Sequence, residues 1–188
     1  MRKRLGRKFF TRNTLLVAKD LLGKYIVRKY RGKLIVGKIV ETEAYIGPKD
    51  KASHAFGGKI TKRNLAEYYI GGHIYIYLVY GMYWQFNIST GKAGSPECVL
   101  LRALEPDNGD CKLANGPGKL CNYLKVDKKF YGEDLVLSKR IWLEERGVKV
   151  SKKDIVASPR IGIDYAGSYW SKIPWRFYIK DNKYVSKT

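Results

Sequence analysis

Apolar and polar residues alternate with two different periods along this chain. Between residues 15 and 22, leucines and an alanine recur at helical spacing, with Thr11 as the expected N-cap and Gly23 as the expected stop. A second helix is expected to begin at Pro117 and to run to about residue 124. Elsewhere, short apolar runs bounded by turn residues predict strands. The expected strands cover residues 25–30, 34–45, 73–80, 83–89, 98–104, 135–137, 141–143, 161–163 and 176–179.

Many short strands and few helices predict an α+β fold, a single mixed domain around a largely antiparallel β-sheet. The 188 residues fit one domain spanning 1–188, with a basic N-terminal segment at 1–10. Gly81 joins the strands at 73–80 and 83–89, because glycine readily takes the positive φ that a tight hairpin needs. We therefore expect a protruding β-hairpin with Tyr80 at its turn.

The charge balance points to a polyanionic partner. Lysine and arginine total 37 against 17 aspartate and glutamate, which gives a formal net charge of +20. A solvated basic surface is the plain alternative, but an excess this large on a small domain favours nucleic acid. The chain has no apolar run of about 18 residues and no signal core, so we expect no membrane contact and a cytoplasmic location. Three cysteines without C-x-x-C spacing and two histidines argue against disulfides, zinc knuckles and a metal site.

One arginine and two glutamates are candidates for chemistry. Arg102 interrupts an otherwise apolar strand, where a charge is costly unless it is paired. Glu41 and Glu43 share one face of the strand at 34–45. Either could be a solvated edge residue. Glu43 is the sharper candidate for a general base, because the neighbouring Tyr45 could help to form a partly dry pocket.

Tyrosines provide a second signal. Tyr75 and Tyr77 share a strand face, where tyrosines are most often core or half-exposed sheet surface. Tyr80 is different, because an aromatic ring at a hairpin turn has no neighbour to pack against. On a strongly basic protein, such a ring suits insertion between base pairs.

Seven motifs, in order and at matching spacings, resemble the alkyladenine (3-methyladenine, methylpurine) DNA glycosylase family of mammalian type. Together they cover nearly the whole chain from Thr11 onward, and the short N-terminus is similar to compact microbial members. The motifs are ETEAYIGP at 41–48, YGMY at 80–83, NIS at 87–89, LLRALEP at 100–106, NGPGKL at 115–120, PRIGI at 159–163 and WRFY at 175–178.

The resemblance implies a monofunctional glycosylase of base-excision repair that flips a damaged purine out of duplex DNA and hydrolyses its N-glycosidic bond. The implied substrates are alkylated or deaminated purines of the 3-methyladenine, 7-methylguanine and hypoxanthine class. Glu43 corresponds to the catalytic base that activates water, and Arg102 and the Ile161 carbonyl correspond to groups that help to hold this water. An arginine beside a carboxylate keeps it ionised, and Glu41 is left a supporting role.

Further residues correspond to the base pocket. Tyr45 and His54 correspond to one wall and Tyr77 to the other, where rings replace the stacking that a flipped base loses. Electron-rich rings also attract the positive charge of alkylated purines. Asn87 corresponds to a floor residue that hinders guanine, and Tyr80 to the residue that fills the vacated stack. The implied partner is damaged double-stranded DNA bound by a nucleoid-associated monomer without a cofactor.

One departure and two alternatives stay open. Lys62 stands where the family often has proline, which bears on the stiffness of the loop after His54 and on substrate breadth. A bifunctional lyase would use a lysine amine, and counting lysines does not exclude it. A non-catalytic basic module that binds nucleic acid would have the same surface and tyrosines, and the role of Glu43 separates it from an enzyme. A zinc deaminase lacks its H-x-E and P-C-x-x-C motifs here.

Overall fold

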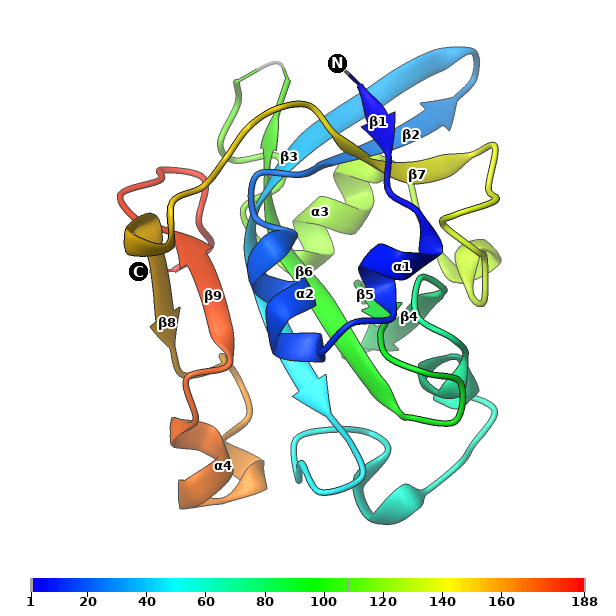
Figure 1. The fold of residues 1–188 in the computed structure, drawn as a ribbon, viewed down its shortest axis with the longest axis vertical. Helices are drawn as coiled ribbons and strands as arrows, with labels where there is room; N and C mark the ends of the chain where they lie inside the picture. The colour runs from blue at the N-terminus through cyan, green and yellow to red at the C-terminus, as the bar shows by residue number, and fades with distance from the viewer. Residues whose placement is uncertain (1, 108, 188) are drawn as a thin grey trace.

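A computed structural model describes residues 2–107 and 109–187 of the chain (Figure 1). Met1 of the basic segment and Asn108 of the loop expected at 106–116 lie outside the described residues. The fold is α+β around a large antiparallel sheet, which confirms the predicted fold class. Its strands are β1 (Lys3–Arg4), β2 (Tyr25–Tyr30), β3 (Lys33–Ile46), β4 (Ile74–Val79), β5 (Tyr83–Ser89), β6 (Glu97–Pro106), β7 (Ile141–Glu145), β8 (Ile155–Ser158) and β9 (Arg176–Ile179).

Four α-helices and five short 3-10 turns complete the described part of the chain. None of the helices there is long and apolar enough to cross a bilayer. The α-helices are α1 (Arg7–Phe10), α2 (Thr14–Asp20), α3 (Pro117–Leu124) and α4 (Ser168–Lys172). The 3-10 turns are η1 (Phe56–Gly58), η2 (Leu65–Tyr68), η3 (Lys128–Phe130), η4 (Lys152–Asp154) and η5 (Asp164–Ala166).

The long strand β3 organises the sheet. The strand order is β1-β7-β2-β3-β6-β5-β4, and β9 pairs with both β3 and β8. The first half of β3 pairs with β2, whereas residues 41–43 pair with β9. Because β6 runs along the other side of β3, residues 41–43 have a neighbouring strand on each side. Residues 41–43 are therefore central in the sheet, and their side chains are completely buried. Figure 1 shows the β8–β9 pair and α4 beside this stretch.

The first helix predicted from the sequence has a different cap. Asn13, rather than the expected Thr11, precedes α2, and its Oδ1 accepts hydrogen bonds from the backbone N–H groups of Leu15 and Leu16 at 3.0 and 3.3 Å. An asparagine side chain is at least as good an N-cap as threonine, and it stands next to the first helical residue. The Thr42 hydroxyl donates a 2.9 Å hydrogen bond to the Ala18 carbonyl. This bond fixes α2 to the middle of β3.

Helix α3 supports the hairpin formed by β4 and β5. It begins at Pro117 and ends at Leu124, as predicted, and packs against β5 and β6. A Cβ atom on Gly118 would lie 2.8 Å from the ring of Tyr83, so glycine permits the close approach of β5. Packing against α3 thus anchors the base of the hairpin, and its tip extends away from the rest of the protein.

The basic N-terminal segment is part of the fold. Strand β1 pairs with β7, and Phe10 at the end of α1 is completely buried. Neither β1 nor α1 was expected from the sequence, because the runs are only two and four residues long. Strand β8 and helix α4 are also additions to the predicted elements.

The strand predicted at 135–137 is wrong. Asp134 Oδ1 accepts a 2.9 Å hydrogen bond from the Val136 N–H, and the Leu137 N–H donates to the Asp134 carbonyl. An aspartate that bonds the backbone two residues ahead makes a turn, and this local bond prevails over the apolar run. Leu137 is consequently 75% exposed.

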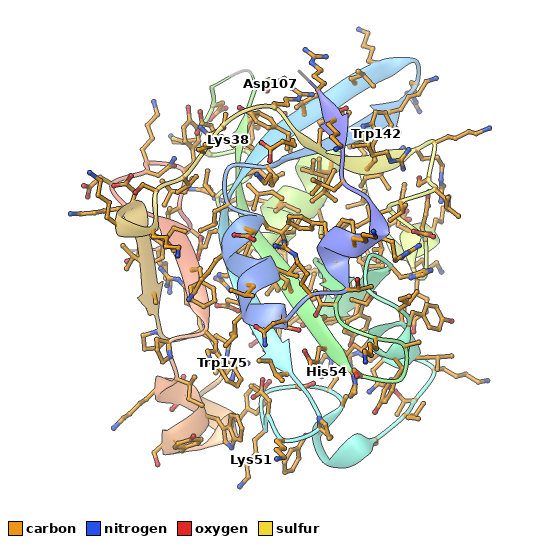
Figure 2. All side chains as sticks on the ribbon, in the orientation of Figure 1. Lys38, Lys51, His54, Asp107, Trp142 and Trp175 are labelled. Carbon is orange, nitrogen blue, oxygen red and sulfur yellow. The ribbon has the colours of Figure 1, made fainter. Side chains whose placement is uncertain are left out.

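The loop after β3 lies at one end of the molecule. Figure 2 shows Lys51 and His54 at this end, and Lys38 and Trp142 at the opposite end. The hydrophobic core lies between them and is shared by the sheet and helices α2 and α3. The chain thus places the loop of His54 beside the last residues of β3.

Candidate active site

Glu43 lies completely buried near the end of β3, with three hydrogen-bonding or ionic partners. Its Oε1 accepts a 2.8 Å hydrogen bond from the backbone N–H of Ile161 and lies 3.3 Å from Nη1 of Arg102. Its Oε2 accepts a 2.8 Å hydrogen bond from the Tyr45 hydroxyl. A carboxylate has about four lone-pair sites, so this arrangement leaves one site on Oε2.

Arg102 bridges the two glutamates of β3. Its Nε donates a 3.0 Å hydrogen bond to Glu41, and its Nη1 approaches Glu43. Burial alone would lower the pKa of Arg102, but the charges of Glu43 and Glu41 outweigh it and raise the pKa above the ordinary value. Arg102 therefore stays a cation. An arginine in an apolar strand was expected to be paired, and its contacts with Glu41 and Glu43 supply the partners.

Glu41 is saturated by other partners. Besides Arg102 it has Arg176 on β9 at 3.2 Å. Ser186 near the C-terminus donates two more hydrogen bonds, from its backbone N–H at 2.7 Å and from its hydroxyl at 3.0 Å. Glu41 is fully buried and pairs with both Arg102 and Arg176, and the supporting role expected for it stays a prediction.

Tyr45 stands between Glu43 and a buried ion pair. The Arg160 guanidinium lies 4.6 Å from the centre of the Tyr45 ring and makes a two-pronged contact with Asp50, at 2.5 and 2.9 Å. Burial, reinforced by the negative charge of Glu43, raises the pKa of Tyr45 well above its ordinary value. The phenol therefore keeps its proton and remains a donor to Glu43.

Ile161 reaches Glu43 because the expected strand at 161–163 does not form. Gly162 has a φ of +75°, which ends any extended run, and the Ile161 N–H bonds to a side chain instead of a strand. The structure thus brings Ile161 to the carboxylate through its N–H. The role expected for its carbonyl stays a prediction.

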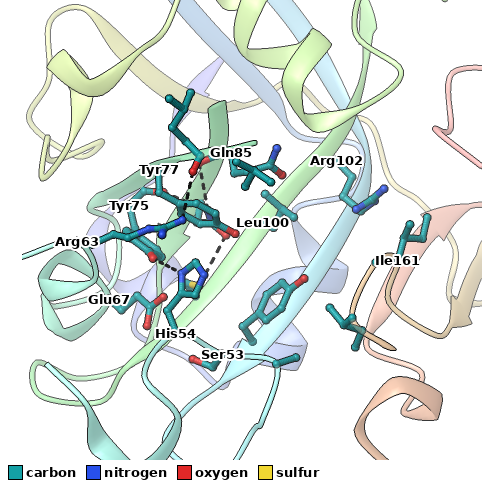
Figure 3. Close-up of a pocket in the computed structure, with 18 of the residues that line it drawn as sticks. Ser53, His54, Arg63, Glu67, Tyr75, Tyr77, Gln85, Leu100, Arg102 and Ile161 are labelled. Atoms are coloured by element: carbon teal, nitrogen blue, oxygen red, sulfur yellow. Dashed lines mark hydrogen bonds between the residues drawn. The ribbon is translucent and has the colours of Figure 1, made fainter. Parts of the chain in front are cut away.

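A cavity of about 580 Å³ opens beside this cluster. Arg102 and Ile161 lie on one side of it, and His54 and Tyr77 lie on the other (Figure 3). This volume is within the range that holds a small planar ligand, roughly 300–1,000 Å³. Glu43 itself is behind the wall, and three of the residues that line the cavity contact it, namely Tyr45, Arg102 and Ile161.

His54 and Tyr77 contact each other across one part of the cavity. Their ring centres are 4.6 Å apart at an angle of 72°. A flat ligand between two parallel rings needs roughly 7 Å, twice the usual contact distance, so these two rings do not enclose such a gap here. Burial, together with the charge of Arg63, lowers the pKa of His54 to about 4, so the imidazole is neutral at physiological pH. The wall assignments of His54, Tyr45 and Tyr77 stay predictions.

Asn87 lies on the cavity lining and is fixed by the backbone. It is 1% exposed, and its Nδ2 donates 3.2 Å hydrogen bonds to the carbonyls of Tyr75 and Gln85. Its Oδ1 accepts a weak 3.8 Å contact from the thiol of Cys98. Because both amide hydrogens are used, Asn87 has a single orientation toward the cavity.

Tyr80 stands at the tip of the β4–β5 hairpin, as predicted. It is 86% exposed and has a φ of +52°, a value that is rare for a bulky residue. Gly81 follows with a φ of +70°, and Met82 is also exposed. The Tyr80 side chain is therefore largely exposed to solvent. Tyr80 also contributes to the lining of the cavity.

Sequence reasoning missed several titratable residues of the cavity lining, among them Arg63, Glu67 and Tyr165, and Glu67 is the acidic one. It belongs to η2, lines the cavity and is 2% exposed. The sequence predicts one or two helical turns over residues 64–69, which agrees with η2, but so short a turn has no periodic pattern that would show which of its side chains faces a cavity. For metal ions, residues 2–107 and 109–187 contain no group of three or more His, Cys, Asp or Glu side chains that could hold one.

Comparisons with known proteins agree on one family. The family model described as methylpurine-DNA glycosylase matches residues 8–183. A protein of Carboxydothermus hydrogenoformans is 47% identical over 97% of this chain and 98% of its own length. Proteins of Desulfitobacterium hafniense and Natranaerobius thermophilus are 44% and 43% identical, over 98% and 97% of this chain and 98% of their own lengths. All three are provisionally named 3-methyladenine DNA glycosylases.

Proposed function

Because the chain belongs to the methylpurine-DNA glycosylase family, we infer that it is a DNA-3-methyladenine glycosylase, a DNA-repair enzyme. Its reaction removes a damaged purine from DNA by breaking the bond between the base and deoxyribose. The net charge of +20 suits a DNA substrate, because each bound phosphate is best met by a cation.

We propose that Glu43 activates the water of this reaction. The support is its partner set: Arg102 and the Ile161 N–H occupy Oε1, and Tyr45 takes one site on Oε2. The remaining lone pair on Oε2 is fixed in direction by these partners. A general base held in this way accepts the proton of a water that adds to C1′ of the sugar.

The charge of the substrate makes the bond easy to break. An alkylated purine such as 3-methyladenine is positively charged and leaves as a neutral base when the C1′–N bond breaks. Water then adds to C1′, and its proton goes to Glu43. A neutral lesion such as hypoxanthine needs an added proton on the base, so we expect slower release of neutral lesions.

The damaged base has to leave the duplex to reach this cavity, because no side chain can act on its sugar bond inside the stack. Tyr80 is the proposed wedge that occupies the vacated position. Its exposure at the tip of a hairpin whose base is packed against α3 supports this role. Tyr45, His54 and Tyr77 are the proposed aromatic contacts to the base, and Asn87 is the proposed residue that hinders guanine.

The direct test is strand breakage after alkali on duplexes that each carry one lesion. We expect release of 3-methyladenine-class bases by the wild type, and loss of release by Glu43→Gln with duplex binding preserved. Equal release by Glu43→Gln would refute the role of Glu43. Binding to lesion duplexes without release by the wild type would instead identify a non-catalytic binding module. Trapping with borohydride is a separate control, because a covalent adduct would indicate a lysine-dependent lyase.

A further inference from the structure

Arg160 is a buried cation between the candidate site and the loop that carries His54. Its side chain is completely buried, and its guanidinium makes a two-pronged contact with Asp50, at 2.5 and 2.9 Å. Its Nη1 also donates a 3.0 Å hydrogen bond to the Ala44 carbonyl of β3. Burial alone would lower the pKa of Arg160, but the hydrogen bonds and charge of Asp50 outweigh burial and raise this pKa. Arg160 therefore stays a cation.

Asp50 ties this cation to the beginning of the His54 loop. Its Oδ1 accepts a 2.9 Å hydrogen bond from the Ala52 N–H, and its Oδ2 accepts one of 3.3 Å from the Ile46 N–H. The carboxylate is completely buried, and it bonds the backbone on both sides of the turn after β3. The position of this part of the loop is therefore coupled to the position of Arg160.

One link from Arg160 to Glu43 runs through Tyr45. The guanidinium lies over the Tyr45 ring, 4.6 Å from its centre, and the hydroxyl of this ring donates to Oε2 of Glu43. A cation over an aromatic ring is attracted by the ring's negative face, and the attraction is stronger away from water. Trp175 places a second ring 5.2 Å from the same guanidinium. Arg160 thus helps to fix the ring, and with it the direction of the hydroxyl.

A second link to Glu43 runs through the backbone. The Ile161 N–H that donates to Oε1 of Glu43 belongs to the peptide group that Ile161 forms with Arg160. Because a peptide group is planar, the backbone of Arg160 sets the direction of this N–H. Pro159 on the other side has a fixed φ, and the side-chain contacts of Arg160 hold the residue between them. Two of the three partners of Glu43 are therefore oriented through Arg160.

We propose that Arg160 is a positioning residue of base release: paired with Asp50, it sets the directions in which Tyr45 and Ile161 donate to Glu43. This proposal rests on the proposed role of Glu43 as the general base. The two donors decide which lone pair of the carboxylate is free for water. A displaced donor misdirects this lone pair, and a general base acts efficiently only when it is correctly placed.

A lysine at position 160 would keep the charge but lose the geometry. An ammonium is a compact point charge on a flexible stem, whereas the planar guanidinium reaches Asp50, the Ala44 carbonyl and the Tyr45 ring at once. The Nε of Arg160 is buried without a hydrogen-bond partner in the part of the chain that the structure describes, a cost that lysine would not carry. Arg160→Lys therefore removes the positioning contacts and preserves a cation beside Asp50.

Arg28 provides a matched control for this substitution. It is also a buried arginine, 7% exposed, with its guanidinium 4.6 Å from the centre of the Phe130 ring and 5.5 Å from that of Tyr30. Its hydrogen bonds go to backbone carbonyls of β2 and of the residue before β7. Arg28→Lys should therefore lose comparable packing and leave the donors of Glu43 in place.

Hydrogen exchange followed by nitrogen-15 NMR of labelled isoleucine tests the positioning without any substrate. Ile161→Val assigns the Ile161 amide, because it keeps the N–H and removes the labelled residue. We expect this amide to exchange roughly tenfold faster in Arg160→Lys than in the wild type, as for the loss of about one net hydrogen bond. Arg28→Lys should exchange like the wild type at this amide. Equal exchange in Arg160→Lys and the wild type overturns the proposal.

Single-turnover base release tests the consequence for the reaction. We expect Arg160→Lys to slow release roughly tenfold, with little change in the binding of a lesion duplex. The acid limb of its rate profile should also move to higher pH, because a carboxylate that loses hydrogen-bond donors binds a proton more readily. Arg28→Lys should change neither the rate nor the acid limb. An acid limb that stays in place in Arg160→Lys overturns the positioning role, whatever happens to its stability.

A double-mutant cycle shows whether Arg160 acts through Tyr45. Residues that act together are not additive, so Arg160→Lys with Tyr45→Phe should lose less than the product of the two single losses. Losses that multiply overturn this action. Should Arg160→Lys not fold, Asp50→Asn replaces it in every measurement with the same expected directions, because it keeps an oxygen acceptor and removes the charge. A wild type that releases no base, with the Ile161 amide response intact, refutes the proposed function and leaves the positioning supported.

Discussion

The hydroxyl of Tyr45 donates a 2.8 Å hydrogen bond to Oε2 of Glu43, two residues earlier on the same strand. Alternate residues of a strand share a face, so β3 alone supplies both the proposed base and the ring beside it. The remaining partners of Glu43 come from β6 and from the loop before η5.

Removing the Tyr45 hydroxyl should slow base release more than it weakens lesion binding. Tyr45→Phe keeps the ring but frees Oε2 of Glu43, and a hydrogen bond to a charged group contributes about 1.5–3 kcal/mol. We expect single-turnover release to fall by roughly tenfold or more, and binding of a lesion duplex to change little. Tyr45→Leu is the matched variant, because it removes the ring as well and should weaken both. A release rate for Tyr45→Phe equal to that of the wild type would contradict the arrangement.

Arg102 should be essential for stability as well as for activity. Arg102→Leu leaves two buried carboxylates with Arg176 as the remaining cation of the cluster. Removing one partner of a buried ion pair destabilises a protein by about 3–5 kcal/mol. Urea denaturation measures this change. Glu41→Gln is the control, because it removes one negative charge from the cluster and should cost less. A change below about 1 kcal/mol for Arg102→Leu would mean that the cluster is hydrated.

The ring of Tyr80, and not its backbone, should matter for capturing a flipped base. Tyr80→Ala and Tyr80→Gly both remove the ring, but glycine also relieves the positive φ of this position. We expect equal losses of base capture, measured with a fluorescent purine in the duplex, with unchanged binding to undamaged DNA. Thermal unfolding should show Tyr80→Gly to be more stable than Tyr80→Ala, by about 0.5–1 kcal/mol. Capture retained in the glycine variant would show that the tyrosine is only a surface contact.

Glu67 should make the protein less stable as pH rises. The pKa of Glu67 is about 8 in the folded protein and near 4.5 in the unfolded chain, so the folded state holds the proton more tightly. This contribution to stability is complete below about pH 4.5 and is lost as pH rises to about 8. The free energy of unfolding of the wild type should fall relative to Glu67→Gln over this range, by at most about 5 kcal/mol. Parallel pH profiles of the two proteins would place Glu67 in water.

Binding to DNA should weaken steeply with salt. A protein that contacts 6–10 phosphates loses about 10³–10⁵ in affinity between 50 and 200 mM salt. With a formal charge of +20, this enzyme should behave in that way on undamaged duplex. Tyr80→Ala should show the same salt slope in a fluorescence titration, because its change removes no cation. A slope near zero would argue against a DNA substrate.

Regular alternation made most of the sheet predictable. Strands β2, β5 and β9 and helix α3 have the predicted bounds, and β3, β4, β6 and β7 differ by one or two residues at an end. The failures have local causes. Asp134 forms a turn where the apolar residues 135–137 predicted a strand. The positive φ of Gly162 interrupts the strand predicted at 161–163. Two-residue β1 is held by pairing with β7, which no local pattern reports.

The candidate site was only partly predictable. The motifs indicated Glu43, Tyr45, Arg102 and Ile161, and the structure brings these four together. The contact through the Ile161 N–H, the saturation of Glu41 by Ser186 and the burial of Glu67 depend on residues far apart in sequence. Such contacts arise from tertiary packing, and spacing along the chain does not encode them.

The partners of Glu41 also set an order of events during synthesis. Its arginine Arg102 follows 61 residues later in the chain, and Ser186 follows 145 residues later. The contacts of Glu41 with Ser186 can therefore form only after Ser186 has been synthesised. The partners of Glu43, namely Tyr45, Arg102 and Ile161, all precede this serine in the sequence, so they are available earlier.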